Sequence, residues 1–143
     1  MKTVHVAAAV MIRGDRVYAT QRGYGEFKDK WEFPGGKVEA GETPEKALVR
    51  EIKEELAAQI SVGKRLTTVE YDYPEFHLVM DCYLCSVDPS TLKLLEHENA
   101  EWLTWRDFNK MDWMEADKKV VEAVKAFFKE AERKMVLCQI LGC

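Results

Sequence analysis

The sequence predicts a single α+β domain in which two helices accompany several strands. Its length of 143 residues is that of one domain. Segments with strand composition follow one another as hairpins, and only two segments have the periodicity of an amphipathic helix. This order is typical of an antiparallel or mixed sheet, not of regular strand–helix alternation. No repeat, low-complexity segment or linker divides residues 1–143.

The N-terminal part is expected to begin with a hairpin. Residues 3–12 predict a buried strand, residues 13–15 a turn, and residues 16–22 the second strand. A glycine-rich polar loop covers residues 23–30. A short strand at 31–33 then leads into a Pro-Gly-Gly turn.

The first helix is expected to begin after Thr43. Threonine is a good N-cap, and Pro44 suits the first helical position because its fixed φ is already helical. Leu48, Ile52 and Leu56 recur every four residues and therefore predict the buried face of this helix.

The C-terminal half predicts further strands at 66–73, 76–87 and 100–105, followed by a second helix at about 116–133. The apolar tail, residues 135–143, has three interpretations: an added strand, a dimer contact or a disordered end.

Composition excludes several classes of function. The net charge of −4 does not favour binding to a nucleic acid polymer. No apolar run approaches the ~20 residues that span a bilayer, and the N-terminus lacks the cleavage site of a signal peptide. We therefore expect a cytoplasmic protein. Cys82 and Cys85 lie three apart on a predicted strand and would point to opposite faces, so we expect thiols there and no metal site.

Three acids, Glu51, Glu54 and Glu55, occupy positions i, i+3 and i+4 of the first helix and therefore share one face. A solvated acidic face is one interpretation. The other is a site for Mg²⁺, with Mn²⁺ as a possible substitute, since hard cations favour carboxylate oxygens and bridge to phosphates. Gly35 and Gly36 come shortly before the helix and offer exposed backbone groups, which favours the second interpretation.

The span Gly36–Ala58 resembles the Nudix box, whose pattern is G-x5-E-x7-R-E-U-x-E-E-x-G-U with U a bulky aliphatic residue. The matching positions are Gly36, Glu42, Arg50, Glu51, Ile52, Glu54 and Glu55. Ala57 and Ala58 depart from the pattern, which has glycine and a larger aliphatic residue there. If position 57 takes a positive φ, alanine costs roughly 1 kcal/mol.

Residues 31–51, 69–74, 101–102 and 115–117 resemble the corresponding stretches of MutT-type members of the family. This resemblance implies a Nudix α/β/α sandwich around a central mixed sheet. It also implies Mg²⁺-dependent hydrolysis of a nucleoside triphosphate to the monophosphate and pyrophosphate, with a role in nucleotide-pool sanitation. The substrate would be 8-oxo-dGTP or a cytidine or other pyrimidine triphosphate. ADP-ribose, or another nucleoside diphosphate linked to a moiety X, is the second candidate. A non-catalytic nucleotide-sensing module is the rival from another class.

The resemblance also implies roles for single residues. Glu51, Glu54 and Glu55 would hold the metal together with the Gly35 carbonyl, and either Glu51 or Glu54 would be the general base. Arg50 would brace the helix by pairing with a carboxylate such as Glu54.

A further acid is expected from a loop after the box. Glu96, Glu98 and Glu101 are available, and the distance from Glu96 to Trp102 resembles that of the equivalent acid in MutT-like chains. We therefore expect Glu96 to be a catalytic metal ligand, with a solvated loop acid as the alternative.

Four residues are implied as substrate contacts, and Glu42 as a supporting brace. Arg22 would contact a phosphate, or else form a surface ion pair. Phe33 would line the pocket and pack against the base, and Phe76 would do the same or belong to the core. Asp117 would read the base, or else cap the last helix. If ionised, Asp117 would only accept hydrogen bonds.

Overall fold

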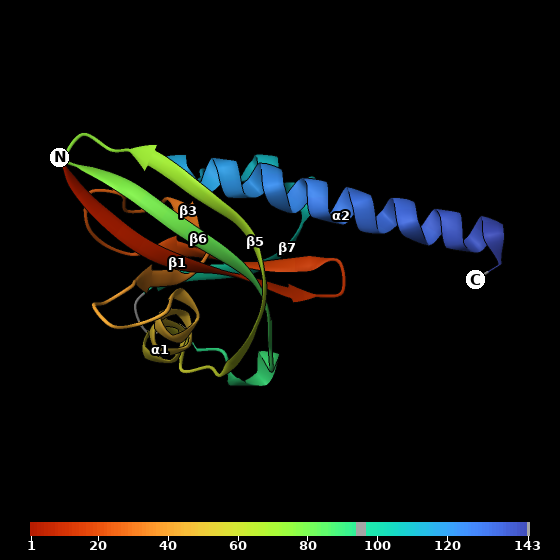
Figure 1. Cartoon of the computed structure of the whole chain (residues 1–143), viewed down its shortest axis with the longest axis horizontal. Helices are drawn as coiled ribbons and strands as arrows, with labels where there is room; N and C mark the ends of the chain where they lie inside the picture. Colours follow the sequence, from red (N-terminus) through yellow and green to blue (C-terminus); the bar gives the residue numbers. More distant parts are fainter. Residues whose placement is uncertain (94–96, 143) are drawn as a thin grey trace.

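The computed structural model describes residues 1–93 and 97–142 (Figure 1). In chain order its elements are β1 (Lys2–Arg13), β2 (Arg16–Arg22), β3 (Trp31–Glu32), β4 (Gly35–Lys37), α1 (Pro44–Leu56), β5 (Ile60–Asp72), β6 (Phe76–Val87), the 3₁₀ helix η1 (Pro89–Thr91), β7 (His97–Thr104), the 3₁₀ helix η2 (Trp105–Lys110) and α2 (Glu115–Leu141).

The sheet is mixed, as predicted. Its strands run in the order β3-β2-β1-β6-β5, while β4 pairs with β1 and β7 pairs with β2. The central strands β1 and β6 are parallel, in register from Lys2 opposite Phe76 to Met11 opposite Cys85. The other pairings between the strands are antiparallel.

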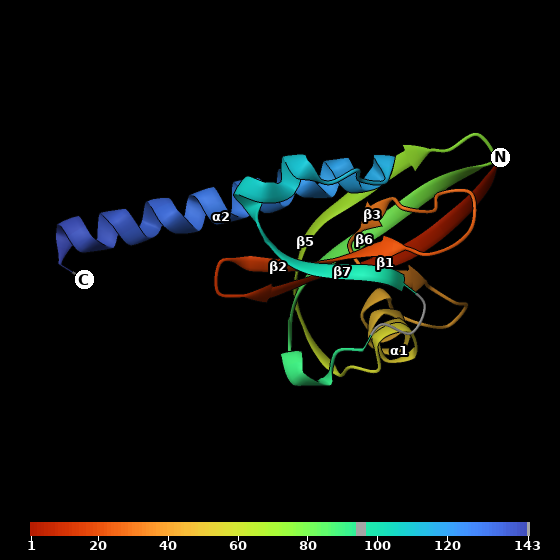
Figure 2. The ribbon, with the colours of Figure 1, turned by 180° about the vertical axis from the view of Figure 1, so that it is seen from behind.

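Helices cover both faces of this sheet. Figures 1 and 2 show α1 against one face and α2 against the other. Because side chains alternate along a strand, β1 supplies both cores. Ala8 and Val10 pack in the core under α2, and Ala7, Ala9 and Met11 pack in the core under α1. The predicted α/β/α sandwich is confirmed.

Helix α1 follows its sequence signals. The hydroxyl of Thr43 accepts a hydrogen bond from the Lys46 N–H at 3.2 Å. The predicted stripe of Leu48, Ile52 and Leu56 is fully buried. The helix ends at Ala57, which has a φ of 55° and donates its N–H to the Lys53 carbonyl at 3.1 Å. Alanine therefore occupies the left-handed conformation for which the family pattern has glycine.

The expected Pro-Gly-Gly turn is wrong in part, because Gly35–Lys37 forms strand β4 against β1. A Cβ atom on Gly35 would lie 2.0 Å from the Ala7 carbonyl oxygen, so only glycine allows the two backbones to approach this closely. Strand β5 begins at Ile60, earlier than expected. Its register shifts between Val62 and Arg65 and again before Thr67, and these irregularities interrupt the alternation that predicts a strand.

The last helix is longer than its predicted span of 116–133. Helix α2 continues to Leu141, so an added strand or a disordered end is wrong for residues 135–141. The extension is rich in good helix formers, and Gly142 ends it with a φ of 75°. In the described part of the chain, no helix combines the length and apolar character needed to cross a membrane.

The thiols of Cys82 and Cys85 lie on opposite faces of β6, as expected from strand geometry. Cys82 packs in the core under α2 and Cys85 in the core under α1. Burial raises the pKa of Cys85 to about 12 and that of Cys82 further still. Both are free thiols held in the protonated form.

Candidate active site

A pocket of about 410 Å³ gathers most of the predicted site residues. One group of lining residues surrounds the acidic helix face and consists of Gly35, Gly36, Lys37, Glu39, Glu51 and Glu55. A second group is apolar and aromatic around one buried acid and includes Phe33, Tyr73, Phe76, Leu78, Met80, Met114 and Asp117. Arg22 and Glu32 also line it. One cavity therefore joins a carboxylate cluster to a surface suited to a planar ring.

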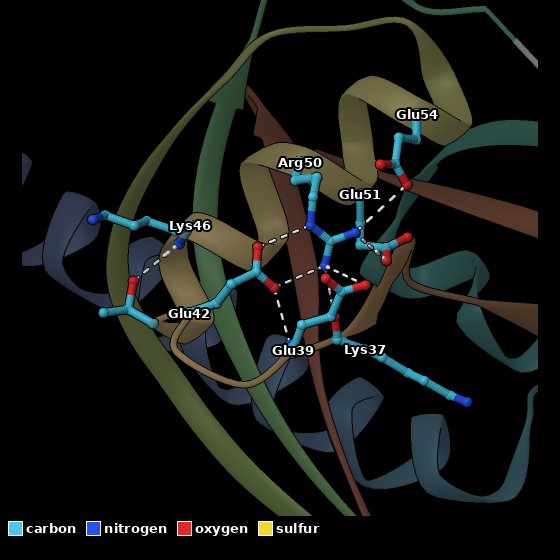
Figure 3. Close-up of polar contacts among 8 residues, drawn as sticks. Lys37, Glu39, Glu42, Lys46, Arg50, Glu51 and Glu54 are labelled. Atoms are coloured by element: carbon cyan, nitrogen blue, oxygen red, sulfur yellow. Dashed lines mark hydrogen bonds and ion pairs between the residues drawn. The ribbon is translucent and has the colours of Figure 1, made fainter.

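Arg50 is the hub of the acidic group (Figure 3). Its Nε and Nη2 atoms each donate to a different oxygen of Glu42 at 2.8 Å. Its Nη1 atom donates to Glu51 Oε1 at 2.8 Å and lies 3.5 Å from Glu54 Oε2. Nη2 also donates to the Lys37 carbonyl at 3.0 Å. The predicted pair with Glu54 is present. The shorter contacts of Arg50, with Glu42, the Lys37 carbonyl and Glu51, hold the preceding loop and the Glu51 side chain in place.

Glu42 is the supporting residue that the sequence predicts. The hydrogen bonds from Arg50 lower the pKa of Glu42 to about 2, with a further contribution from the Glu39 N–H. This N–H donates to Glu42 Oε1 at 3.0 Å. The ionised carboxylate therefore links the loop at Glu39 to the helix at Arg50.

Gly36 brings the backbone of β4 against the carboxylate of Glu51. A Cβ atom on Gly36 would lie 2.3 Å from the carboxyl carbon of Glu51 and 2.4 Å from its Oε2 atom. A side chain at position 36 would thus occupy the space that the carboxylate fills. This close approach gives a physical reason for the glycine in the box pattern.

The acidic group has the donor chemistry of a Mg²⁺ site. Glu51 and Glu55 line the pocket beside Gly35, while the Glu54 side chain is 58% exposed and pairs with Arg50. Among the described residues, no three His, Cys, Asp or Glu side chains are grouped as a metal cage. Mg²⁺ keeps several waters and needs only one or two carboxylates plus substrate phosphates, so the residues present fit it.

Glu96 lies outside the described residues. Its role as a catalytic metal ligand stays a prediction from the sequence.

Asp117 lies in the first turn of α2 and is 5% exposed. Its Oδ1 atom accepts a hydrogen bond from the Phe33 N–H at 2.9 Å. It is not the helix cap, because the N-cap is Met114 and makes no side-chain capping bond. Burial, followed by the nearby charge of Glu32, raises the pKa of Asp117 well above its usual value. The Phe33 N–H and Arg22 oppose this rise.

Arg22 forms a two-bond ion pair with Glu32 at the pocket wall. Its Nε donates to Glu32 Oε2 at 2.8 Å, and its Nη2 donates to Oε1 at 3.2 Å. The ion pair considered from the sequence is therefore present. The phosphate contact of Arg22 stays a prediction.

The two predicted aromatic residues both line the pocket, each stacked on a neighbour. Phe33 stacks on Trp113 with ring centroids 5.0 Å apart and an interplanar angle of 15°. Phe76 stacks on Tyr73 at 5.1 Å and 26°. Phe76 is half-buried and packs against the core, as one interpretation expects, and its contact with the base stays a prediction.

Sequence reasoning missed several lining residues. Leu78 and Met80 follow Phe76 at alternate positions of β6, so strand periodicity was a signal that places them on the same face. Tyr73 and Met114 offered no comparable signal, because a tertiary contact positions them. The Tyr73 hydroxyl accepts a hydrogen bond from the Ala116 N–H at 3.2 Å.

Comparison with known proteins shows which sequences this chain resembles. A Proteus vulgaris protein named 8-oxo-dGTP diphosphatase is 39% identical over 85 residues, which are 58% of this chain and 76% of the relative. An Escherichia coli protein named CTP pyrophosphohydrolase is 29% identical over 127 residues, covering 88% of this chain and 94% of the relative.

Solved structures with this fold include the E. coli ORF135 protein and a MutT NUDIX hydrolase from Burkholderia pseudomallei. The first has a TM-score of 0.77 at 29% identity and covers 88% of this chain and 91% of its own. The second has a TM-score of 0.79 at 25% identity and covers 87% of this chain and 99% of its own. The model of the NUDIX domain matches residues 2–124. The chain therefore belongs to the Nudix family of hydrolases.

Proposed function

We propose that this protein is a Mg²⁺-dependent nucleoside triphosphate pyrophosphohydrolase that removes damaged or surplus nucleotides from the pool. It releases a nucleoside monophosphate and pyrophosphate. The observation that carries the proposal is the single pocket shared by Glu51, Glu55 and Asp117. A nucleotide has the same two parts, a polyphosphate that needs cations and a planar base that needs an apolar surface with a polar reader.

Hydrolysis of a phosphoanhydride mainly requires neutralised charge and a positioned water. The carboxylates of Glu51, Glu54 and Glu55 and the Gly35 carbonyl would hold the cation, with Glu96 as a further ligand. Mg²⁺, when bound, screens phosphate charge and lowers the pKa of its water. Arg50 fixes the rotamer of Glu51 through its 2.8 Å hydrogen bond, and Glu51 or Glu54 accepts the proton of the attacking water.

Asp117 is the proposed reader of the base. Burial raises its pKa well above the usual value of aspartate, which favours the neutral acid, and a neutral acid both donates and accepts a hydrogen bond. The ionised form, considered from the sequence, would only accept hydrogen bonds. A neutral acid complements a base edge with an adjacent donor and acceptor. Cytosine offers the N4 amine beside N3, and 8-oxoguanine offers N7–H beside O6. Both candidate substrates therefore fit the proposed reader.

A hydrolysis screen tests the function. The purified chain is incubated with 8-oxo-dGTP, dGTP, CTP, dCTP and ADP-ribose, each with and without Mg²⁺, and phosphate is measured after adding a pyrophosphatase. We expect phosphate from 8-oxo-dGTP or a cytidine nucleotide only when Mg²⁺ is present. ADP-ribose yields no pyrophosphate, so its cleavage is followed by chromatography. Preference for ADP-ribose would support the second candidate, and nucleotide binding without any hydrolysis would support a sensing module.

A further inference from the structure

The second half of helix α2 extends past the sheet without covering it (Figures 1 and 2). Five large apolar side chains near its end are between 43% and 77% exposed: Met135, Val136, Leu137, Ile140 and Leu141. The family match ends at residue 124, before this extension. A helix end that is apolar on several sides is normally buried against something. We call residues 135–141 the α2 extension.

A groove of about 450 Å³ lies beside the middle of the same helix. Leu66 and Thr67 of β5 form one wall. The α2 wall consists of Ala123, Ala126, Phe127, Glu130, Ala131 and Lys134. Three of these residues are alanines, whose small side chains leave room in the groove for the side chains of another helix.

The groove and the α2 extension share one row of side chains. Reading along α2, the row is Ala123, Phe127, Glu130, Lys134, Leu137 and Leu141. Spacings that alternate between four and three keep these residues on one face of a helix. In this order, the first two side chains of the row are apolar, the third is acidic, the fourth is basic and the last two are apolar. It is therefore complementary to itself when the direction of the helix is reversed.

We propose that this row is the interface of a homodimer, in which α2 of a second copy packs antiparallel in the groove. With the twofold axis level with residue 132, Leu137 meets Phe127 and Leu141 meets Ala123 of the other copy. Glu130 of each copy meets Lys134 of the other. Each α2 extension then fills the groove of its partner beside β5. The contact is isologous and closed, since the same surface serves both copies.

Apolar burial favours a second copy as the occupant. Of the five exposed apolar side chains, Leu137 and Leu141 lie on the row and would be covered, together with Phe127 and the alanines of the groove. Met135, Val136 and Ile140 lie on other sides of the helix and do not contribute to this contact.

The charges also match. Glu130 and Lys134 form the polar centre of the row, and antiparallel packing sets each opposite its counter-charge, beside the ion pair that Glu130 makes with Arg133 of its own helix. Parallel packing would instead set Glu130 against Glu130 and Lys134 against Lys134, so the charges select the antiparallel direction.

Sedimentation equilibrium of the full chain at micromolar concentration tests the proposal. We expect about 33 kDa, twice the 16.5 kDa of one chain. Leu137→Glu on the extension and Ala126→Arg in the groove should each give the monomer mass. Val136→Glu is the matched control, because Val136 is nine residues from Phe127 and so lies on the opposite side of the helix. It should stay dimeric. Far-ultraviolet circular dichroism checks that every variant is folded.

Charge reversal tests the antiparallel register. Glu130→Lys sets a lysine opposite Lys134 on each side of the twofold axis, at the centre of the contact, and should lower the dimer mass toward the monomer. Glu130→Lys combined with Lys134→Glu restores opposite charges and should restore the dimer. A monomeric native chain would overturn the proposal. So would dimers of Ala126→Arg, which would show that the extensions pair without the groove. Dissociation of Val136→Glu would equally overturn it.

Discussion

The carboxylate of Glu51 lies directly against the backbone of Gly36, at a distance that leaves no space for a Cβ atom between them. Strand β4 and helix α1 therefore contact each other through the carboxylate of a candidate active-site residue. Arg50 then holds the same carboxylate from the other side at 2.8 Å.

Gly36→Ala is therefore expected to displace the Glu51 side chain. The added Cβ would lie 2.3 Å from the carboxyl carbon, so the carboxylate must rotate or β4 must move. We expect kcat/KM to fall at least about 100-fold, which corresponds to a loss of roughly 2.7 kcal/mol of transition-state stabilisation. Steady-state kinetics measure this effect. Activity within a few-fold of the native enzyme would show that the position of Glu51 is not critical.

The pair of Glu42 and Arg50 predicts an acid-sensitive element of stability. The pKa of Glu42 is about 2 in the folded protein against 4.5 for the free group, so the folded state holds the ionised form more tightly. Its contribution is present above pH 4.5 and is lost as the pH falls from 4.5 toward 2.

Thermal melts across that window compare the native chain with Glu42→Gln. The melting temperature of the native chain should approach that of the variant as the pH falls. Parallel curves over the whole window would mean that Glu42 titrates normally in the folded protein.

Ala57→Gly is expected to stabilise the protein. Alanine at a φ of 55° pays a steric penalty that glycine avoids, and removing it is worth roughly 1 kcal/mol. For a domain of this size the melting temperature should rise by about 2–4 °C. Ala58→Gly is the control, since Ala58 is buried and has no positive φ, and it should destabilise. An Ala57→Gly variant that melts below the native chain would contradict this reading of the helix end.

Much of the fold could be predicted from local signals, and the exceptions have physical causes. Helix α1 was predicted well because its cap, its first proline and its apolar stripe all lie between Thr43 and Leu56. Strand β4 was missed because glycines carry no strand propensity, and only the approach of β1 reveals why they are needed.

The same contrast holds for the site. The carboxylates of α1 were found because spacing on one helix fixes their mutual position. Tyr73, Met114 and the burial of Asp117 depend on how α2 packs on the sheet, which no local pattern encodes. The N-cap interpretation of Asp117 failed for this reason, as the helix begins at Glu115 and the carboxylate turns inward.

The acidic helix face predicts a metal-dependent stability. Glu51, Glu54 and Glu55 repel one another on one turn, so bound Mg²⁺ should raise the melting temperature. Glu51→Gln should shrink that rise. Glu54→Gln and Glu55→Gln should each lower kcat by orders of magnitude while the protein stays folded. A melting temperature independent of Mg²⁺ would instead indicate a solvated acidic face.

The burial of Asp117 predicts that Asp117→Asn will remove part of the pH dependence of the protein's stability. Its pKa is raised in the folded protein, so the folded state binds a proton that the unfolded chain has released. Stability therefore falls as the pH rises from the ordinary pKa of aspartate toward the raised value. Asparagine is a close structural mimic of the neutral acid and does not titrate. The melting temperature of Asp117→Asn minus that of the native chain should accordingly increase with pH across this range.

The protonation of Asp117 should also affect catalytic activity. If the neutral acid reads the base, Asp117→Asn should retain activity on the best substrate to within about tenfold near neutral pH. Asp117→Ala should leave the base edge without its buried hydrogen-bond partner, which costs roughly 1–3 kcal/mol or about 5- to 150-fold in kcat/KM. The native profile should also decline as the pH rises through the raised pKa of Asp117, and the Asn variant should lack that decline. A melting difference that is flat with pH would show that Asp117 is ionised despite its burial. The Asn variant would then lose as much activity as the Ala variant, because an amide does not replace a carboxylate that only accepts.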